Sequence, residues 1–500
     1  AGARLQNYHF FFDLFAAEIY RLARVPILDL YFRFLPLFLG WLQAAIVFIL
    51  GWRWSGEKKV GVWSVILICF ASSWGWLLPL VGLGSNNWET AFWAMQPATG
   101  LQNPPFFLSL ILLGAGLLLF WHFLKEKSWR FILILALLWG GLVQIKIYSG
   151  LVLLAALGSL AIGKLVFARK KKLLILWLVC LGISLLLYLP FNQLGGSFVN
   201  WEPGWFVRIM IQAGDRVNWV DLELRRQAYL AGGNKLAVMM IDFLSVVIFI
   251  VGNLGIRVIG FFYLGRKLLK RKPLGNLGWL FLLIFTFAIL PPLLFTQRFL
   301  PWNTIQFFYY AIFIFSFFAS REVVSWQRRI KKPALKIILG ILLVVLAVPG
   351  SLKTISWHWS QPSTSVLDNQ EQAALEFIKE QNQGSQTILT YPYVQPSGLV
   401  IPPPVPLSYY NAAYVSFFTA SPVYLEDHTA ALIQGYDYQN RLEKSKWFFS
   451  TNNLGEAKDF LSKNKIGYVY LVDGQQWQAK LEDLFELVYE NNRARVYHLD

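Results

Sequence analysis

The sequence has few charged residues and few cysteines. Only 15% of its 500 residues are Asp, Glu, Lys or Arg, and there are two cysteines and five scattered histidines. So little charge excludes an ordinary soluble globular protein. Cys69 and Cys180 both lie inside apolar runs. The sequence therefore offers neither a disulfide framework nor a thiolate metal site.

Familiar catalytic signatures are absent as well. The sequence has no glycine-rich phosphate loop, no HExxH and no paired Cys/His spacing of a metal site. Scattered histidines do not support Ser-His-Asp chemistry. No inverted repeat of Gly- or Pro-broken segments is evident, so a secondary transporter gets no positive support.

Apolar residues are abundant instead. The chain is 56% hydrophobic and 17% aromatic, with a mean hydropathy of +0.47. These values indicate a multispanning membrane protein, with aromatic rings suited to its interfaces with water. By apolar length we predict about ten crossings, at residues 30–52, 60–83, 105–124, 131–145, 148–167, 173–191, 237–265, 277–296, 303–320 and 335–351.

The net charge of +17 is confined to the membrane part. From Lys353 to the end there are 11 basic and 16 acidic residues. The basic excess occurs as short blocks between apolar runs, which is a topology signal and excludes a nucleic-acid partner. Five connectors hold 21 Lys and Arg, whereas the other four loops hold 7. The positive-inside rule places the five connectors in the cytoplasm; they contain Arg53–Lys59, Lys125–Arg130, Arg169–Lys172, Arg266–Lys272 and Arg321–Lys336.

This orientation requires residues 131–167 to cross twice, with a break near Gln144-Ile145-Lys146. Each pass is then about 15 to 20 residues, near the lower limit for a span. The alternative is one long helix and a single failure of the rule. We favour the broken pair, because Gln and Lys at membrane depth are costly without water or a partner.

The orientation also sets the domain organisation. Residues 1–28 are predicted to be the amphipathic end of a first extracytoplasmic loop, in a chain that starts partway through a larger protein. Residues 29–352 form the transmembrane domain, and residues 353–500 form an extracytoplasmic α/β domain. The loops 84–104, 192–236 and 297–304 face the same side, so any chemistry is expected there.

The tail has ordinary helix and strand patterns. A proline-rich irregular loop is expected at 392–408, and a hairpin across Asn491-Asn492. The predicted helices are Val366–Glu380 and Leu454–Lys463, and the predicted strands are Gln386–Tyr391, Tyr468–Val472, Phe485–Glu490 and Arg493–Leu499. The fold class is thus mainly α: a polytopic helix bundle with a small C-terminal α/β domain.

Two candidate sites lie in the first half of the chain. His9, Asp13 and Glu18 sit among aromatic residues, and helical spacing puts His9 and Asp13 on one face. The carboxylates of Asp13 and Glu18 could act at a transfer site or bind a metal or pyrophosphate. The alternative is an amphipathic helix at the membrane surface whose polar face contacts water. Gln144 and Lys146, beside Tyr148, mark the helix break, where the lysine either meets a lipid-linked phosphate or snorkels from a helix end.

Two more candidates follow. Glu202 lies between Trp201 and Trp205 and precedes Arg208, Asp215 and Arg216. Aromatic residues beside a carboxylate and arginines suit a sugar and a phosphate, or alternatively an interfacial aromatic belt.

The last candidate contains Arg298, Trp302, Asn303 and Gln306. Asn303 and Gln306 are at i and i+3 at the outer mouth of a helix. They either line a cavity or hold neighbouring helices together.

Several segments carry a resemblance to a known family. They are Ala1–Leu5 with Tyr8-His9 and Asp13-Leu14, Pro203–Phe206 through Asp215-Arg216, Trp302–Tyr310, Tyr468–Tyr470, Val488–Glu490 and Val496-Tyr497. Together with the many crossings, the outer helix break and the outer α/β domain, they resemble the GT-C superfamily of integral membrane glycosyltransferases, in particular its uncharacterised bacterial members. The resemblance covers nearly the whole chain.

The resemblance implies sugar transfer from a polyprenyl-phosphate donor to a glycan, lipid or protein acceptor at the outer face of a bacterial plasma membrane. The family's usual catalytic carboxylate follows its first helix, a position this sequence does not contain. Asp13 is the nearest candidate, with His9 beside it. Such a carboxylate deprotonates the acceptor or binds a divalent metal that does so, and the residues leave both open.

A second function of another class remains: a polysaccharide or lipid transporter, or a non-catalytic subunit of a cell-envelope assembly. It would use the same polar cavity without a catalytic carboxylate.

Overall fold

The structure is a computed structural model that describes residues 5–84, 86–126, 128–192, 199–298, 300–360, 367–392 and 412–499. The chain divides into two compact units, Tyr8–Ser360 and Ala1–Asn7 with Gln361–Asp500. Each is described by itself.

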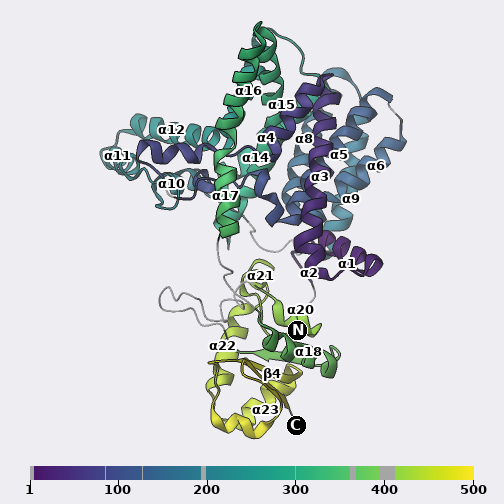
Figure 1. Cartoon of the computed structure of the whole chain (residues 1–500), viewed down its shortest axis with the longest axis vertical. Helices are drawn as coiled ribbons and strands as arrows, with labels where there is room; N and C mark the ends of the chain where they lie inside the picture. Colours follow the sequence, from purple (N-terminus) through teal and green to yellow (C-terminus); the bar gives the residue numbers. More distant parts are fainter. Residues whose placement is uncertain are drawn as a thin grey trace. The chain divides into compact units, whose positions relative to one another are not determined.

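The unit Tyr8–Ser360 is a helical bundle (Figure 1). Its α-helices are α1 (Phe11–Ala23), α2 (Ile27–Asp29), α3 (Leu35–Ser55), α4 (Lys58–Cys69), α5 (Pro104–Glu126), α6 (Arg130–Gly140), α7 (Leu142–Ile145), α8 (Ile147–Ala168), α9 (Lys172–Tyr188), α10 (Trp205–Gln212), α11 (Val220–Ala231), α12 (Lys235–Leu254), α13 (Gly260–Leu269), α14 (Gly275–Leu294), α15 (Gln306–Arg329), α16 (Pro333–Ala347) and α17 (Pro349–Ser360). A π-helical turn, η1 (Leu30–Phe34), joins α2 to α3. The 3-10 helices are η2 (Trp74–Val81), η3 (Thr90–Phe92), η4 (Pro97–Gln102), η5 (Leu189–Phe191), η6 (Gly255–Ile259) and η7 (Pro301–Ile305).

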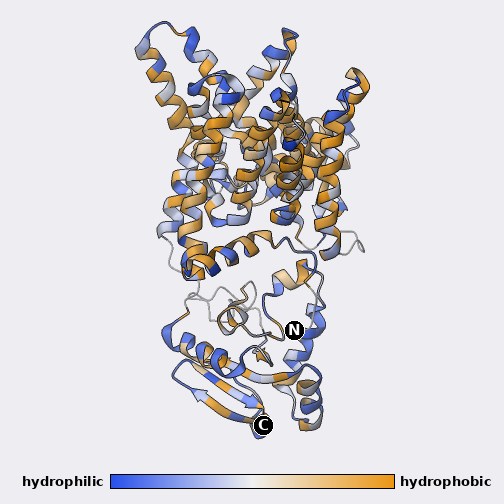
Figure 2. Ribbon diagram, turned by 90° about the vertical axis from the view of Figure 1, so that its right-hand side faces the viewer, coloured by the Kyte–Doolittle hydropathy of each residue, from blue (hydrophilic) through white to orange (hydrophobic). Residues whose placement is uncertain are grey.

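The predicted membrane spans are present. Within the described residues, seven helices are long and apolar enough to cross a membrane, or up to nine if each of two bent helix pairs is one span, and 130–145 is a shorter apolar helix. Hydrophobic residues run along these helices, and hydrophilic ones gather at their ends (Figure 2). The chain is an integral multi-pass membrane protein, and the mainly α fold class is confirmed.

The helix α15 forms the centre of the bundle. Every residue from Phe308 to Ser320 on it is buried, and α4, α13 and α14 pack around it. Aromatic rings fill much of this core: Phe285 stacks on Phe315 with ring centroids 4.2 Å apart. A helix that is buried all round needs apolar residues on every face, which is why α15 shows little amphipathic pattern.

The predicted break in 131–167 is also observed. α7 ends at Ile145, Lys146 is extended with φ −158° and ψ 107°, and α8 begins at Ile147. Ser149 Oγ donates a hydrogen bond to the Lys146 carbonyl at 2.8 Å and satisfies one backbone group at the break.

A short ribbon joins two loops that are far apart in sequence. β1 (Val199–Trp201) pairs antiparallel with β2 (Phe295–Gln297). We did not predict it, because two three-residue strands carry almost no pattern of their own.

The second unit contains a four-stranded sheet in the order β3-β4-β6-β5. Its strands are β3 (Thr387–Thr390), β4 (Ile466–Val472), β5 (Phe485–Glu490) and β6 (Ala494–Leu499), and β3 is parallel to β4 while the other pairs are antiparallel. The helices are α18 (Asn369–Asn382), α20 (Tyr414–Thr419), α21 (His428–Ile433), α22 (Tyr438–Ser450), α23 (Leu454–Lys463) and the 3-10 helix η8 (Ala479–Leu484).

The predicted elements of this unit are confirmed, including the 454–463 helix and the hairpin across Asn491-Asn492. Both faces of β4 are buried, with Val469 and Leu471 in one cluster and Tyr468 and Tyr470 in another. We did not predict α20, α21 and α22. Of the predicted proline-rich loop 392–408, only Pro392 is among the described residues.

We predict that Gly116→Ala destabilises the bundle. A Cβ at Gly116 of α5 would overlap the indole nitrogen of Trp139 on α6, a fully buried side chain. Overpacking of this kind costs about 1–3 kcal/mol, so the midpoint of thermal unfolding in detergent should fall by several degrees.

The matched control is Gly163→Ala, at a helical glycine of α8 with open space around it. Its unfolding midpoint should stay the same or rise, because alanine favours helix. Equal midpoints for both variants would contradict the close packing of α5 on α6.

Candidate functional site

The site begins at the helix break, where Lys146 is buried. Only 7% of the surface of Lys146 is exposed. Within the described part of the chain, its ammonium has no carboxylate within ion-pair distance, and its nearest recorded aromatic neighbour is the Tyr148 ring, 5.9 Å away. A buried ammonium without a counter-ion is costly, so this position is suited to an anionic ligand.

Polar side chains from three further segments are linked to this lysine through Tyr148. Asn303 Nδ2 donates to the Tyr148 hydroxyl at 2.7 Å and to Gln297 Oε1 at 2.8 Å. Gln306 donates to Asn303 Oδ1. These residues, together with Lys146, are called the Lys146 cluster below. They come from α8, β2, η7 and α15, so tertiary folding brings them together.

Two amide oxygens near this cluster have no hydrogen-bond partner although they are buried. One is Oε1 of Gln306 and the other is Oε1 of Gln144. The Gln144 amide nitrogen is bound, donating to the Leu187 carbonyl at 2.7 Å. Buried acceptors without a donor are rare, and hydroxyl groups of a ligand would satisfy them.

His9 adjoins Lys146. Burial, and then the positive charge of Lys146, lower the pKa of His9 to about 3. The imidazole is therefore neutral at physiological pH, with one nitrogen donating and the other accepting. The neighbouring helix α1 is anchored by Phe12, which is buried in a cluster with Ile145.

The predicted helical face shared by His9 and Asp13 is not formed. Helix α1 begins only at Phe11, after Asn7 with a positive φ of 54°. Asp13 is in its first turn and accepts a hydrogen bond from the Tyr8 hydroxyl at 2.8 Å. Burial raises the pKa of the Asp13 carboxyl, while the Tyr8 hydrogen bond opposes this. Glu18 is exposed and pairs with Arg21 at 2.7 Å.

Glu202 lies at the β1–β2 ribbon. Its carboxylate accepts from Thr296 Oγ1 at 3.0 Å. Thr296 and Gln297 are successive strand residues, so their side chains point to opposite faces. Glu202 is therefore on the other face of the ribbon from the Lys146 cluster. Arg208 donates to the Pro203 carbonyl at 3.0 Å, a local contact.

Arg216 holds two loops together. It donates to the Thr90 carbonyl at 2.8 Å, lies 4.1 Å from the Trp93 ring centroid and approaches Asp215 at 3.3 Å. These contacts engage part of the guanidinium in the protein itself, while its buried Nε has no hydrogen-bond partner among the described residues. Arg298 is exposed, as is Trp302 at 52%, and neither belongs to the Lys146 cluster.

The structure adds Glu89, which we did not single out from the sequence. Its buried carboxylate accepts from Gln96 N at 2.7 Å and from Thr99 Oγ1 at 2.5 Å. Thr354 also hydrogen-bonds to it. Burial raises the pKa of Glu89, and these hydrogen bonds and the charge of Arg257 oppose the rise.

Glu89 also borders a cavity of about 510 Å³, whose lining includes Trp88, Lys353, Trp357 and His358. The sequence does carry a signal for Glu89, because Glu89 is the only Asp, Glu, Lys or Arg between Lys59 and Lys125.

The C-terminal unit has a cavity of its own, of about 480 Å³, lined by residues that include Tyr424, Glu426, Tyr436, Tyr438 and Arg441. The Glu426 carboxylate accepts from the backbone N–H groups of Val415 at 2.6 Å and Ser416 at 3.0 Å. Burial raises the pKa of Glu426 to about 7. Tyrosines beside a carboxylate and an arginine can bind a sugar or a peptide.

Comparison with known proteins defines the class of fold. The chain is similar to the crystal structure of the Archaeoglobus fulgidus oligosaccharyltransferase in complex with Zn and sulfate, with a TM-score of 0.50 and 13% identity over 98% of this chain and 64% of that one. It is similar to the apo form of the same enzyme, with a TM-score of 0.50 and 12% identity over 93% of this chain and 61% of that one.

This chain therefore shares the fold of those structures and spans less than two thirds of their length. No family model and no curated protein sequence matches it.

We predict that Glu426 makes the C-terminal unit less stable as the pH rises. The folded-state pKa of about 7 lies above the ordinary value of 4.5. Its contribution is therefore fully present below about pH 4.5 and is lost as the pH rises through 7. Hydrogen-exchange protection of residues 412–450 should fall several-fold between pH 5 and pH 8.

Glu426→Gln should largely remove this pH dependence. Glu443→Gln, at an exposed position of α22, should retain it. A pH dependence that persists unchanged in Glu426→Gln would assign it to another group.

Proposed function

We propose that the chain is a membrane glycosyltransferase that moves a sugar from a polyprenyl-phosphate-linked donor to an extracytoplasmic acceptor. The observation that carries the proposal is the buried ammonium of Lys146, which has no counter-ion among the described residues, together with the unused acceptors of Gln144 and Gln306. The shared fold with an oligosaccharyltransferase supports it.

Lys146 would bind the phosphate of the donor. A phosphate supplies the counter-ion that Lys146 lacks among the described residues, and a lipid carrier can reach a break between two spans from the bilayer. Gln144 and Gln306 would accept hydrogen bonds from sugar hydroxyls through their unpaired Oε1 atoms. Neutral His9 would donate one further hydrogen bond without adding charge.

Asp13 would act as the general base. Its carboxylate has a single recorded hydrogen-bond partner, Tyr8, whereas Glu89 is satisfied by Gln96, Thr99 and Thr354. Asp13 therefore retains the capacity to accept a proton. Glu89 instead fixes the loop between η2 and α5.

The reaction is then a balanced displacement. The acceptor hydroxyl gives its proton to Asp13, and its oxygen forms a bond to the anomeric carbon. The bond from that carbon to the phosphate oxygen breaks. The leaving polyprenyl phosphate gains negative charge, which the Lys146 ammonium stabilises.

A metal does not fit the described residues. Among them, no group of three or more His, Cys, Asp or Glu side chains lies together as a metal site would require. The similar oligosaccharyltransferase structure contains Zn, but neither Asp13 nor Glu89 belongs to such a group among the described residues. No step above passes through a metal.

The remaining features concern the setting. We place the protein in a bacterial plasma membrane, with the C-terminal unit outside, following the distribution of Lys and Arg. The tyrosine-lined cavity at Glu426 would help to bind a glycan, lipid or protein acceptor.

We predict that Asp13→Asn and Lys146→Ala each lower sugar transfer at least about tenfold, because each removes a charge used in the transition state. The assay is transfer of radiolabelled sugar from a polyprenyl-phosphate donor in proteoliposomes with the full-length protein. Glu18→Gln, on the exposed face of α1, is the matched control and should retain activity.

Unchanged turnover in both Asp13→Asn and Lys146→Ala would refute the site. Movement of labelled substrate across the bilayer without a new glycosidic bond would favour the transporter instead.

A further inference from the structure

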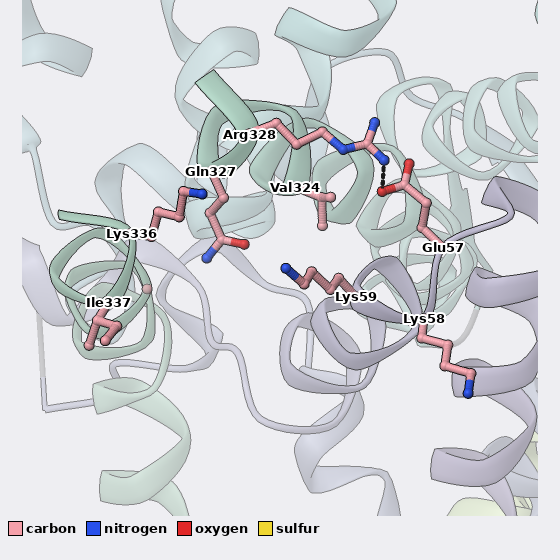
Figure 3. A pocket seen from close by; sticks show the side chains of 9 residues that line it. Glu57, Lys58, Lys59, Val324, Gln327, Arg328, Lys336 and Ile337 are labelled. Atoms are coloured by element: carbon pink, nitrogen blue, oxygen red, sulfur yellow. Dashed lines mark ion pairs between the residues drawn. The ribbon is translucent and has the colours of Figure 1, made fainter. Parts of the chain in front are cut away.

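Another cavity, of about 670 Å³, lies between α4, α15 and α16 (Figure 3). It is separate from the site above, since none of its lining residues belongs to the Lys146 cluster. Four basic side chains and one carboxylate line it: Lys58, Lys59, Arg328, Lys336 and Glu57. The other lining residues are Val324, Gln327, Ile337 and Gly340.

The single carboxylate does not neutralise this cavity. Glu57 forms an ion pair with Arg328 at one side. Lys59 and Lys336 have no ion pair among the described residues, and Figure 3 shows their ammonium groups flanking the Gln327 amide. Lys58 instead points away, toward the Trp52 ring at 5.2 Å. Two unpaired cations therefore face one space.

The Gln327 amide is oriented by a contact with α4. Its Oε1 accepts from Trp63 Nε1 at 3.2 Å, which leaves its Nε2 without a recorded partner. The ammonium groups of Lys59 and Lys336 form the kind of cationic pair that binds a phosphate group.

One wall of the cavity is continuous with an apolar surface. In α16 only Leu343 and Ala347 are buried, so the first half of the helix stands away from the bundle. Ile337, Ile338 and Ile341 on this half are each more than half exposed. In a membrane-spanning helix these side chains meet acyl chains. A ligand here would thus have a charged end at Lys59 and Lys336 and an apolar end along α16.

We propose that this cavity is a binding site for the phosphate headgroup of an anionic phospholipid, at the end of the bundle that the basic connectors mark as cytoplasmic. The headgroup phosphate lies between Lys59 and Lys336, and its acyl chains follow the exposed face of α16. Basic pockets between membrane helices on that side recognise such lipids. Free phosphate carries the same anionic group as the headgroup, but only a lipid also contacts the apolar wall of the cavity.

The test measures binding of fluorescent phosphatidylglycerol to the purified full-length protein in detergent. The double variant Lys59→Gln/Lys336→Gln should bind about tenfold more weakly, because two cations near the headgroup are lost. Lys170→Gln/Lys171→Gln, which removes two exposed lysines from another connector on the same predicted face, is the matched control and should bind like the wild type.

Two competitors separate the sources of the phosphate. Unlabelled phosphatidylglycerol should displace the probe, whereas inorganic phosphate at the same concentration should not. Displacement by inorganic phosphate would overturn the lipid assignment, and equal weakening in both double variants would show a general surface attraction in place of a site. If the double variant fails to fold, each single variant should weaken binding about threefold, and wild-type affinity in both would refute the proposal.

Discussion

Polar groups at membrane depth must find partners inside the protein, because lipid offers none. Arg257 shows how completely this constraint can be met. Its guanidinium is fully buried and donates to the carbonyls of Leu67, Ala71, Ser72 and Leu254 and to Gln96 Oε1. A cation with so many acceptors is structural, since it joins the end of α4 to η6 and to the loop that carries Gln96.

Lys146 is the counter-example in the same bundle. It is also buried, yet its ammonium has no comparable set of acceptors among the described residues. Removing a charge from water without compensation costs several kcal/mol, and a ligand phosphate at Lys146, as proposed above, would offset this cost. The contrast between Arg257 and Lys146 thus separates a residue that holds the bundle together from one that is available for binding.

How much of this was predictable depends on the range over which each signal acts. The spans follow from apolar length, and the break at Lys146 follows from the alternation of basic connectors, since both signals lie along the chain. The tail hairpin follows from local alternation across Asn491-Asn492. The spacing argument for His9 and Asp13 was wrong, because Asn7 and Phe10 delay the start of α1 to Phe11. Pattern alone does not show where a helix begins.

The candidate site was harder to predict because its geometry is non-local. Gln297 and Asn303 could be picked out only as polar residues near a helix mouth, and Tyr148, their partner, lies about 150 positions away in the sequence. The contacts of Arg216 with Trp93 and Thr90 are equally non-local, and the sequence gives no sign of them. Residue types narrow the choice of candidates, but hydrogen-bond satisfaction decides among them, and that depends on the folded structure.

The same criterion applies at the other end of the bundle. Positive charge is expected on a cytoplasmic face, so basic residues there are no evidence of a site by themselves. What distinguishes Lys59 and Lys336 from Arg169–Lys172 is their arrangement: they face one cavity with Gln327, while the only carboxylate there is taken by Arg328. Such an arrangement can bind both ends of an amphiphile at once, the charged end at the lysines and the apolar end at the wall formed by α16. A charged loop without an apolar wall attracts only the charged end.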